Sequence, residues 1–356
     1  MIIRVPATSA NIGPGFDVVG LSLSLYLTLT ISYPLTPPSS TYSPPTLSYS
    51  GQGADHVPLD PYKNLTTRVA LYVLRCHNIP RFPSHLVIQV NNEIPFGRGL
   101  GSSGAAVIAG VLLANSLGKL DLPNERLLDF ALMVERHPDN VTAALIGGFV
   151  GSYLKELDEK ATEAASVPLS EVLPEYPPDA GEDWGLNPPI PPLGIGHYVR
   201  FRWSETIKAL AIIPQFELST AKARQVLPTH YTRKDLVRPF FSFFFFFLTI
   251  LKISPSKVFN LQRLAVLTTA LGQSPPDPGL IYEAMKDRVH QPYRKTLVRL
   301  LLSCYLAVPN PPLFFFLDTR STRSNFFHHT YNPSRTARYL SFRSRTNHPC
   351  FSYRRL

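Results

Sequence analysis

The amino-acid sequence predicts a mixed protein of the α+β or α/β class, because segments with strand and helix patterns are interspersed along the chain. Leucine alternates with serine over residues 21–25, which is typical of a half-buried strand. Apolar residues recur at helical spacing over residues 65–75, and an almost continuous apolar run covers residues 105–113. With 356 residues, the chain is long enough for two domains and a large core.

The individual elements follow from the same patterns. Alternating or β-branched apolar residues predict strands over residues 2–5, 18–31, 86–90, 147–153 and 207–213. Apolar spacing and capping residues predict helices over residues 65–75, 105–117, 124–134 and 258–271, and one that begins at Ser219 or Thr220. Small residues, or proline with polar residues, predict loops over residues 6–15, 34–46 and 167–194.

The net charge of +10 is confined to the last third of the chain. Residues 1–236 contain 18 basic and 21 acidic residues, whereas residues 237–356 contain 17 and 4. The excess positive charge is therefore not a property of one fold. The arginines that carry it gather on no predictable face. We expect no nucleic-acid partner, and an arginine-rich RNA-binding tail remains the weaker alternative.

The cysteines and the apolar segments indicate the cellular compartment in which we expect the protein. Cys76, Cys304 and Cys350 are widely spaced and odd in number, so they offer no disulfide or metal framework and indicate a reducing environment. The chain starts without an apolar leader, and the phenylalanine-rich run over residues 240–251 is shorter than the roughly 20 residues of a membrane helix. We expect a cytoplasmic protein without a membrane partner.

A glycine- and serine-rich run over residues 95–106 precedes the apolar segment. Glycine lets backbone N–H groups approach a ligand, and a helix that starts here adds unpaired N–H donors for an anion. The run lacks the Gly-Lys-Ser/Thr ending of a Walker loop. Its Gly-x-Gly-x-x-Gly match has no acidic residue about 20 positions on, so a dinucleotide site is weakly supported. An ordinary glycine-serine loop is the alternative to a phosphate-binding loop.

Five blocks occur in order along the chain: Val-Pro-Ala-Thr-Ser-Ala-Asn-Ile-Gly-Pro-Gly-Phe-Asp at residues 5–17, the loop at 99–106, Glu-Arg-His-Pro-Asp-Asn-Val at 135–141 with Gly-Gly at 147–148, Leu-Ser-Thr-Ala-Lys-Ala-Arg at 218–224 with Leu-Pro at 227–228, and His-Gln-Pro-Tyr-Arg at 290–294. Together they resemble the homoserine kinase branch of the GHMP small-molecule kinases. The resemblance covers residues 1 to about 236 and 258 to about 296.

The resemblance implies an α+β, two-domain GHMP kinase fold. Residues 1–154 would form the N-terminal ATP-binding domain, and residues 155–296 a ferredoxin-like C-terminal substrate domain. It implies transfer of a phosphoryl group from ATP to L-homoserine in threonine biosynthesis, with ATP and Mg²⁺ as cofactors and a homodimer as a candidate assembly. Phosphoryl transfer needs positioning and charge neutralisation more than covalent chemistry, which suits a glycine loop.

The resemblance also implies site residues. ATP would be bound by Asn64, near the adenine, and by Pro95, Gly97, Arg98, Gly99, Leu100, Gly101, Ser102, Ser103, Gly104 and Ala105. Ser103 and Glu135 would hold Mg²⁺, a hard cation that prefers oxygen ligands. A solvated carboxylate at a helix end is the alternative for Glu135.

Homoserine carries an ammonium group, a carboxylate and a hydroxyl group. By resemblance, the substrate-binding residues would be Asn11, Asp17, His137, Arg224 and Arg294, with the arginines on the carboxylate and Asp17 on the ammonium. The catalytic residues would be Asn140, which orients the hydroxyl, Asp139, the candidate proton acceptor, and Thr220, near the transferred phosphate.

Two segments depart from the family. Residues 237–257 interrupt a stretch that the family continues directly; Val-Arg at its start and the phenylalanine run fit an in-frame retained intron. Residues 297–356 contain no glycine, so the family's last glycine-rich motif is missing and the C-terminal domain would be incomplete. We expect the chain as written to be a weak or inactive kinase. A non-catalytic nucleotide binder and a mevalonate-type GHMP kinase are the other candidate functions.

The intron hypothesis predicts which peptides the native protein contains. A proteolytic peptide that joins Leu236 directly to Val258 is expected in mass spectrometry of the native protein. A peptide from within the phenylalanine run would contradict the hypothesis.

Overall fold

The computed structural model describes residues 1–34, 41–175, 185–213, 220–228, 255–294, 314–318 and 341–342. Most of the predicted insertion, residues 237–254, and most of the predicted tail lie outside these ranges, as do Cys304 and Cys350. Among the described residues, no helix has the length and apolar character that a membrane crossing requires.

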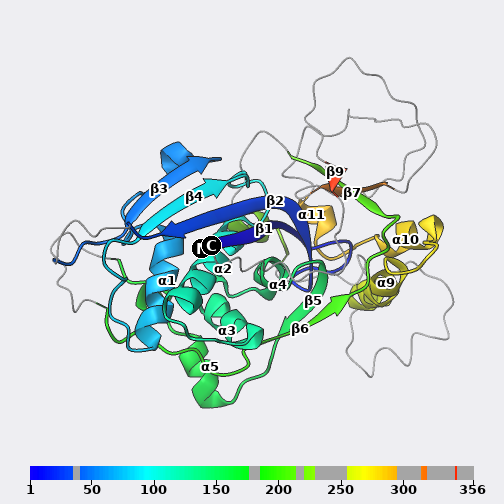
Figure 1. Ribbon diagram of the computed structural model, residues 1–356. Coiled ribbons are helices and arrows are strands. Elements are labelled where there is room, and N and C mark those ends of the chain that lie inside the picture. The colour runs from blue at the N-terminus through cyan, green and yellow to red at the C-terminus, as the bar shows by residue number, and fades with distance from the viewer. Residues whose placement is uncertain are drawn as a thin grey trace.

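A six-stranded mixed sheet forms one layer of the N-terminal part (Figure 1). Its strands are β1 (Ile2–Ala10), β2 (Val19–Ser32), β3 (Thr46–Gly51), β4 (Val87–Asn92), β5 (Phe149–Leu154) and β6 (Gly196–Phe201). The order is β3-β4-β2-β5-β6, with β1 paired to β2. The β3–β4 pair is parallel and the other pairs are antiparallel.

Strand β2 is the centre of this sheet because it pairs with three other strands. Residues 20–23 and 26–30 pair with β1, residues 19–21 pair with β5, and residues 27–32 pair with β4. Its leucines are buried at alternate positions, among them Leu21, Leu27 and Leu29, as the alternating sequence predicts. The loop between β1 and β2 is thereby held at one end of the sheet.

Helices cover one face of the sheet (Figure 1). They are α1 (Leu65–Cys76), α2 (Ser102–Leu117), α3 (Asn124–Glu135) and α4 (Pro138–Ile146). Of the shorter helices, η1 (Ala54–His56) precedes α1 in sequence, and α5 (Glu159–Ala165) and α6 (Leu169–Val172) follow β5. Helix α2 packs against α1, α3, α4 and β1, and ten of its sixteen residues are buried. A helix that is apolar all round occupies such a central position.

The C-terminal part contains β7 (Lys208–Ile212), α7 (Thr220–Gln225), α9 (Pro255–Ala270), α10 (Pro278–Ala284), α11 (Gln291–Arg294), β8 (Phe314–Asp318) and β9 (Ser341–Phe342). Strand β7 pairs parallel with β8 and antiparallel with β9. Two short segments of residues 297–356 therefore contribute strands to this second sheet, and α9 packs against α10.

The structure confirms the predicted strands and helices and corrects two predicted loops. Within the predicted loop over residues 167–194, residues 169–172 form α6. Residues 6–10, predicted as loop, continue β1 as far as Ala10 because they pair with β2. The register shifts between Pro6 and Ala7, which accommodates a residue without a backbone N–H. The elements that were not predicted are the strands β3, β6, β8 and β9 and the helices η1, α4, α5, α6, α10 and α11.

The close packing of α1 on α2 generates a stability prediction. A Cβ on Gly110 would lie 2.4 Å from the Thr66 carbonyl oxygen, whereas a Cβ on Gly104 in the same helix would meet nothing closer than 3.5 Å. Gly110→Ala is expected to destabilise the protein by about 1–3 kcal/mol in urea unfolding, despite alanine's better helix propensity. Gly104→Ala is the matched control, with unchanged or slightly higher stability; equal effects would contradict the packing.

Candidate active site

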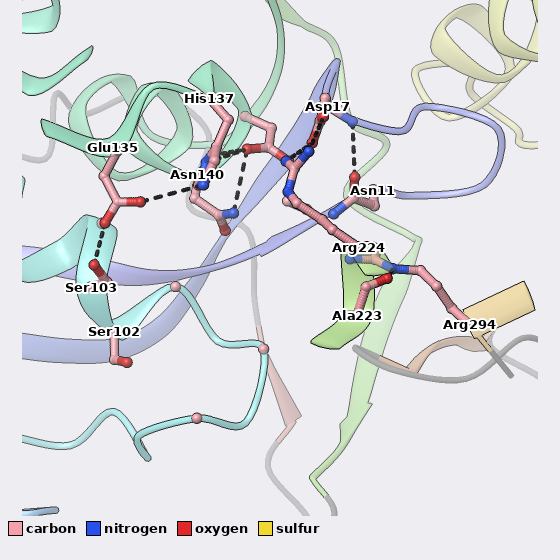
Figure 2. Close-up of a pocket in the computed structure, with 16 residues that line it drawn as sticks. Asn11, Asp17, Ser102, Ser103, Glu135, His137, Asn140, Ala223, Arg224 and Arg294 are labelled. Carbon is pink, nitrogen blue, oxygen red and sulfur yellow. Dashed lines mark hydrogen bonds and ion pairs between the residues drawn. The ribbon is translucent and has the colours of Figure 1, made fainter. Parts of the chain in front are cut away.

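A cavity of about 300 Å³ lies where the β1–β2 loop, the glycine loop and the C-terminal part meet (Figure 2). Predicted site residues make up most of its wall: Asn11, Asp17, Gly97, Gly99, Gly101, Ser102, Ser103, Gly104, Glu135, His137, Asp139, Asn140, Arg224 and Arg294. Ala10 and Ala223 also line it and were not predicted. Segments from five blocks of sequence therefore converge on one space.

The glycine loop is held against β1 by a close approach at Gly101. This residue caps the start of α2 with a φ of 65°, and a Cβ on it would lie 1.9 Å from Thr8 Oγ1. The Thr8 backbone N–H donates to the Leu100 carbonyl at 3.0 Å. The first turn of α2 thus faces the cavity, and a helix N-terminus favours an anion there.

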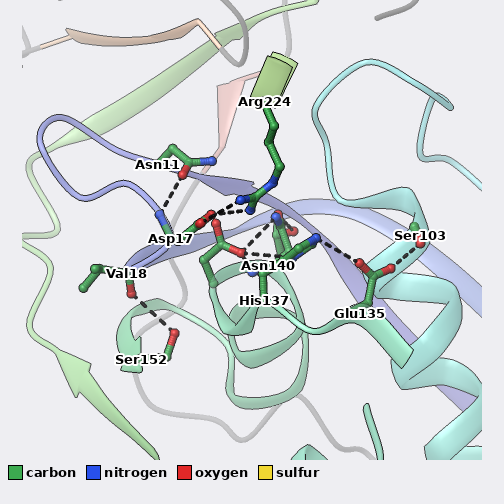
Figure 3. Close-up of polar contacts among 11 residues, drawn as sticks. Asn11, Asp17, Val18, Ser103, Glu135, His137, Asn140, Ser152 and Arg224 are labelled. Atoms are coloured by element: carbon green, nitrogen blue, oxygen red, sulfur yellow. Dashed lines mark hydrogen bonds and ion pairs between the residues drawn. The ribbon is translucent and has the colours of Figure 1, made fainter. Parts of the chain in front are cut away.

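Two side chains on α2 and α3 bring oxygen atoms together at the edge of this loop. Ser103 Oγ donates a short hydrogen bond to Glu135 Oε1, and both residues line the cavity (Figure 3). Glu135 is the last residue of α3, and Arg136 follows it in the left-handed region, which turns the chain towards His137.

His137 lies between two carboxylates. Its Nε2 is 3.6 Å from Glu135 Oε2, and its Nδ1 is 3.6 Å from Asp139 Oδ1. Asp139 raises the pKa of His137 most, and Glu135 adds to the increase, whereas burial and Arg224 oppose it. At 3.6 Å neither contact is a direct hydrogen bond, and each becomes an ion pair when the imidazole is protonated.

Asn140 is held in one orientation by its neighbours. Its Oδ1 accepts a hydrogen bond from Thr8 Oγ1 at 2.8 Å, and its backbone N–H donates to Asp139 Oδ1 at 2.9 Å. Thr8 is fully buried and was not predicted as a site residue, although it belongs to the first sequence block. Its role depends on a contact with α4 that no local pattern reveals.

The two predicted substrate-binding charges Asp17 and Arg224 are paired with each other (Figure 3). The guanidinium group donates from Nη1 to Asp17 Oδ2 at 3.0 Å and from Nη2 to Asp17 Oδ1 at 2.6 Å. The backbone N–H of Asp17 donates to Asn11 Oδ1 at 2.8 Å, and both residues have positive φ values. Asparagine and aspartate tolerate this conformation better than bulkier residues.

Arg294 lies beside this ion pair. Its Nε donates to the Ala223 carbonyl at 3.3 Å, and its guanidinium lies 5.2 Å from the Phe16 ring centroid. The Arg224 guanidinium lies 5.4 Å from the same ring. Burial, followed by the nearby Arg224, lowers the pKa of Arg294. Two cationic groups are thus gathered over one aromatic ring at the cavity wall.

Five predicted residues whose side chains the structure describes do not line the cavity: Asn64, Pro95, Arg98, Leu100 and Ala105. Asn64 caps α1; its Oδ1 accepts from the Thr66 backbone N–H at 3.0 Å, and its Nδ2 donates to the Pro58 carbonyl at 3.1 Å. Leu100 and Ala105 are buried. Thr220 begins α7, and its side chain lies outside the described part of the structure.

Comparison with known proteins places this arrangement in a family. Residues 64–148 match the GHMP kinases N terminal domain. The chain is 52% identical to a homoserine kinase of Saccharomyces cerevisiae over 319 residues, which covers 87% of this chain and 83% of the relative. It is 48% identical to a homoserine kinase of Schizosaccharomyces pombe (87% and 80% covered) and 33% identical to one of Solibacter usitatus (89% and 84%).

A solved structure supports the fold. The homoserine kinase of Cytophaga hutchinsonii superimposes with a TM-score of 0.55 at 23% identity, which covers 84% of this chain and 75% of that protein. This similarity agrees with the predicted α+β architecture of the GHMP kinases.

The environment of His137 generates a pH prediction. An unfolded histidine has a pKa of about 6.5, and the folded-state pKa of His137 is higher. Protonation therefore stabilises the folded state; this contribution is complete below about pH 6.5 and is lost as the pH rises through the folded-state pKa. Asp139→Asn is expected to lower the His137 pKa in an NMR titration and to reduce this pH-dependent stability. An unchanged titration would show that Asp139 is not the cause.

Proposed function

Because the chain belongs to the homoserine kinase family, we propose that it transfers the γ-phosphoryl group of ATP to L-homoserine, giving O-phospho-L-homoserine and ADP. One observation carries the proposal: a single cavity is lined both by the glycine loop at the start of α2 and by the Asp17–Arg224 pair. The first suits polyphosphate and the second suits an amino acid. The product is an intermediate of threonine biosynthesis.

The ion pair supports an α-amino acid as the acceptor. Without a ligand, Asp17 and Arg224 neutralise each other. An amino acid inserted between them places its ammonium on Asp17 and its carboxylate on Arg224 and Arg294, so every charge keeps a partner. A substrate with only a carboxylate leaves Asp17 unpaired, which is costly in a partly buried site. This charge pattern favours homoserine over mevalonate.

The glycine loop supports the nucleotide side of the proposal. Backbone N–H groups of Gly99, Gly101, Ser102 and Ser103 would bind the phosphates, with the α2 dipole adding a favourable field. Pro95, Gly97, Arg98, Leu100, Gly104 and Ala105 would shape the loop around them. Asn64, whose side chain caps α1, would have to exchange its present partners to contact adenine.

The residues also fit Mg²⁺. Among the described residues no group of three or more His, Cys, Asp or Glu side chains forms a metal cluster. Magnesium, however, typically takes one or two protein ligands and completes its shell with phosphate and water. Ser103 and Glu135 offer a hydroxyl and a carboxylate oxygen beside the glycine loop. When bound there, Mg²⁺ would neutralise phosphate charge.

Positioning of the acceptor hydroxyl would rest on α4. In the reaction, a bond forms between the homoserine oxygen and the γ-phosphorus while the bond to the ADP oxygen breaks. Asn140, held by Thr8, would orient the hydroxyl, and Asp139 is the candidate acceptor of its proton. His137 would keep a positive charge beside the carboxylates of Glu135 and Asp139. Thr220 would lie near the transferred phosphoryl group. Asn11 would support Asp17, because its Oδ1 accepts a hydrogen bond from the Asp17 backbone N–H.

Further proposals concern the domains of the chain, its cellular compartment and its assembly. Residues 1–154 and 155–296 would form the ATP-binding and substrate domains, and the protein would act in the cytoplasm, with a homodimer as the candidate assembly. The expectation that the chain as written is weakly active rests on residues 297–356. The structure describes only two strand segments of that stretch, so the expected weak activity stays a prediction.

The proposal predicts how charge changes affect substrate use. The unchanged chain is expected to phosphorylate homoserine in preference to mevalonate in a coupled ADP assay. Asp17→Asn removes the charge that would bind the ammonium group, at about 1.5–3 kcal/mol, so kcat/KM for homoserine should fall roughly 10–100-fold. The KM for ATP should change little.

Asp121→Asn is the matched control, because Asp121 is exposed, has a similar positive φ and lies outside the cavity wall. Combining Asp17→Asn with Arg224→Gln should cost less than the sum of the single changes, since the two side chains are paired. Equal use of mevalonate, or a loss with Asp121→Asn as large as with Asp17→Asn, would contradict the proposal.

A further inference from the structure

A buried polar network lies between α9, α10 and α11, outside the cavity wall. The Asp287 side chain is 0% exposed, and its Oδ2 accepts from the backbone N–H groups of His290 at 2.9 Å and Gln291 at 2.6 Å. Asn260 on α9 donates to Asp287 Oδ1 and accepts from the Arg288 backbone N–H at 3.1 Å. This network fixes the segment that carries His290.

From this segment His290 reaches the N-terminal part of the chain. Its Nε2 lies 2.9 Å from the Gly13 carbonyl oxygen, and Gln291 Nε2 donates to the same oxygen at 3.3 Å. Because a carbonyl only accepts hydrogen bonds, Nε2 carries the proton. Gly13 lies between Asn11 and Asp17 in the β1–β2 loop. Two side chains from the C-terminal part therefore hold the loop that carries the predicted ammonium-binding residue.

His290 also supports an aromatic ring under the two arginines. The Phe16 and His290 ring centroids are 5.1 Å apart, and the guanidinium groups of Arg224 and Arg294 lie 5.4 and 5.2 Å from the Phe16 ring. Burial, as the largest cause, lowers the pKa of His290, which keeps the ring neutral beside these cations; Asp287 opposes this shift. Asp17 and Arg294 are the other charges that act on the ring.

We propose that His290, held by Asp287, is a positioning residue for the amino-acid end of the cavity: it fixes the Gly13 carbonyl and the Phe16 ring, and thereby the direction of Asp17, Arg224 and Arg294. The inference rests on the proposed function. A residue that acts on this end alone should affect homoserine binding and leave ATP binding unchanged, because the glycine loop makes none of these contacts.

The test compares two substitutions of His290 in the full chain. Glutamine places an amide nitrogen near the Nε2 position and can donate to Gly13, whereas leucine fills similar space without a donor. His290→Leu is expected to raise the KM and the calorimetric Kd for homoserine at least about tenfold, with the KM for ATP within about twofold. His290→Gln should restore homoserine binding to within about threefold of the unchanged chain.

Asp287→Asn is the second variant; it keeps the side-chain shape but weakens the hold on the His290 segment. It should raise the homoserine Kd about three- to tenfold, which provides a readout if His290→Leu does not fold. Circular dichroism and thermal unfolding establish that each variant is folded.

Failure of this inference and failure of the proposed function are distinguishable. Unchanged homoserine affinity in folded His290→Leu, or equal losses for homoserine and ATP, would overturn the positioning role alone. His290→Gln as impaired as His290→Leu would overturn it as well. If the unchanged chain bound no homoserine, the proposed function and this inference would both fail.

Discussion

The close approach of Gly101 to Thr8 is the constraint on which the site depends. It leaves no room for a side chain at the start of α2, since a Cβ there would lie 1.9 Å from the threonine hydroxyl. The same hydroxyl donates to Asn140 on α4. One residue of β1 thus determines where the glycine loop ends and where Asn140 points. The pairing of β1 with β2 supplies the rigid support that such spacing requires.

Electrostatic balance is the second organising feature. The cavity wall combines Asp17, Glu135 and Asp139 with Arg224, Arg294 and His137, so partly buried charges have opposite neighbours. In the proposed reaction, an amino acid that carries both charges would enter by exchanging partners with the Asp17–Arg224 pair, while the phosphates would contact backbone N–H groups of the glycine loop. The C-terminal part contributes to this balance through its arginines and stabilises the β1–β2 loop through His290.

Local patterns predicted much of the fold, because alternation in β2, apolar spacing in α1 and the glycine run of the loop act over a few residues. Most of the cavity wall was predicted from the resemblance of five sequence blocks to one family. Other features depend on contacts between distant segments. Strand β3 is a largely exposed edge strand, β1 continues past Pro6 only because β2 pairs with it, and the role of Thr8 requires α4 beside it. Asn64 caps α1 in this structure, and its predicted contact with adenine stays a prediction.

The most direct test is a crystal structure of the full chain with homoserine and a non-hydrolysable ATP analogue. The account predicts the ammonium group on Asp17, the carboxylate on Arg224 and Arg294, the hydroxyl beside Asn140 and the terminal phosphate on the first turn of α2. The direct contact between Asp17 and Arg224 should be opened by the amino acid. Homoserine bound elsewhere, or bound in the cavity with that ion pair intact, would contradict the account.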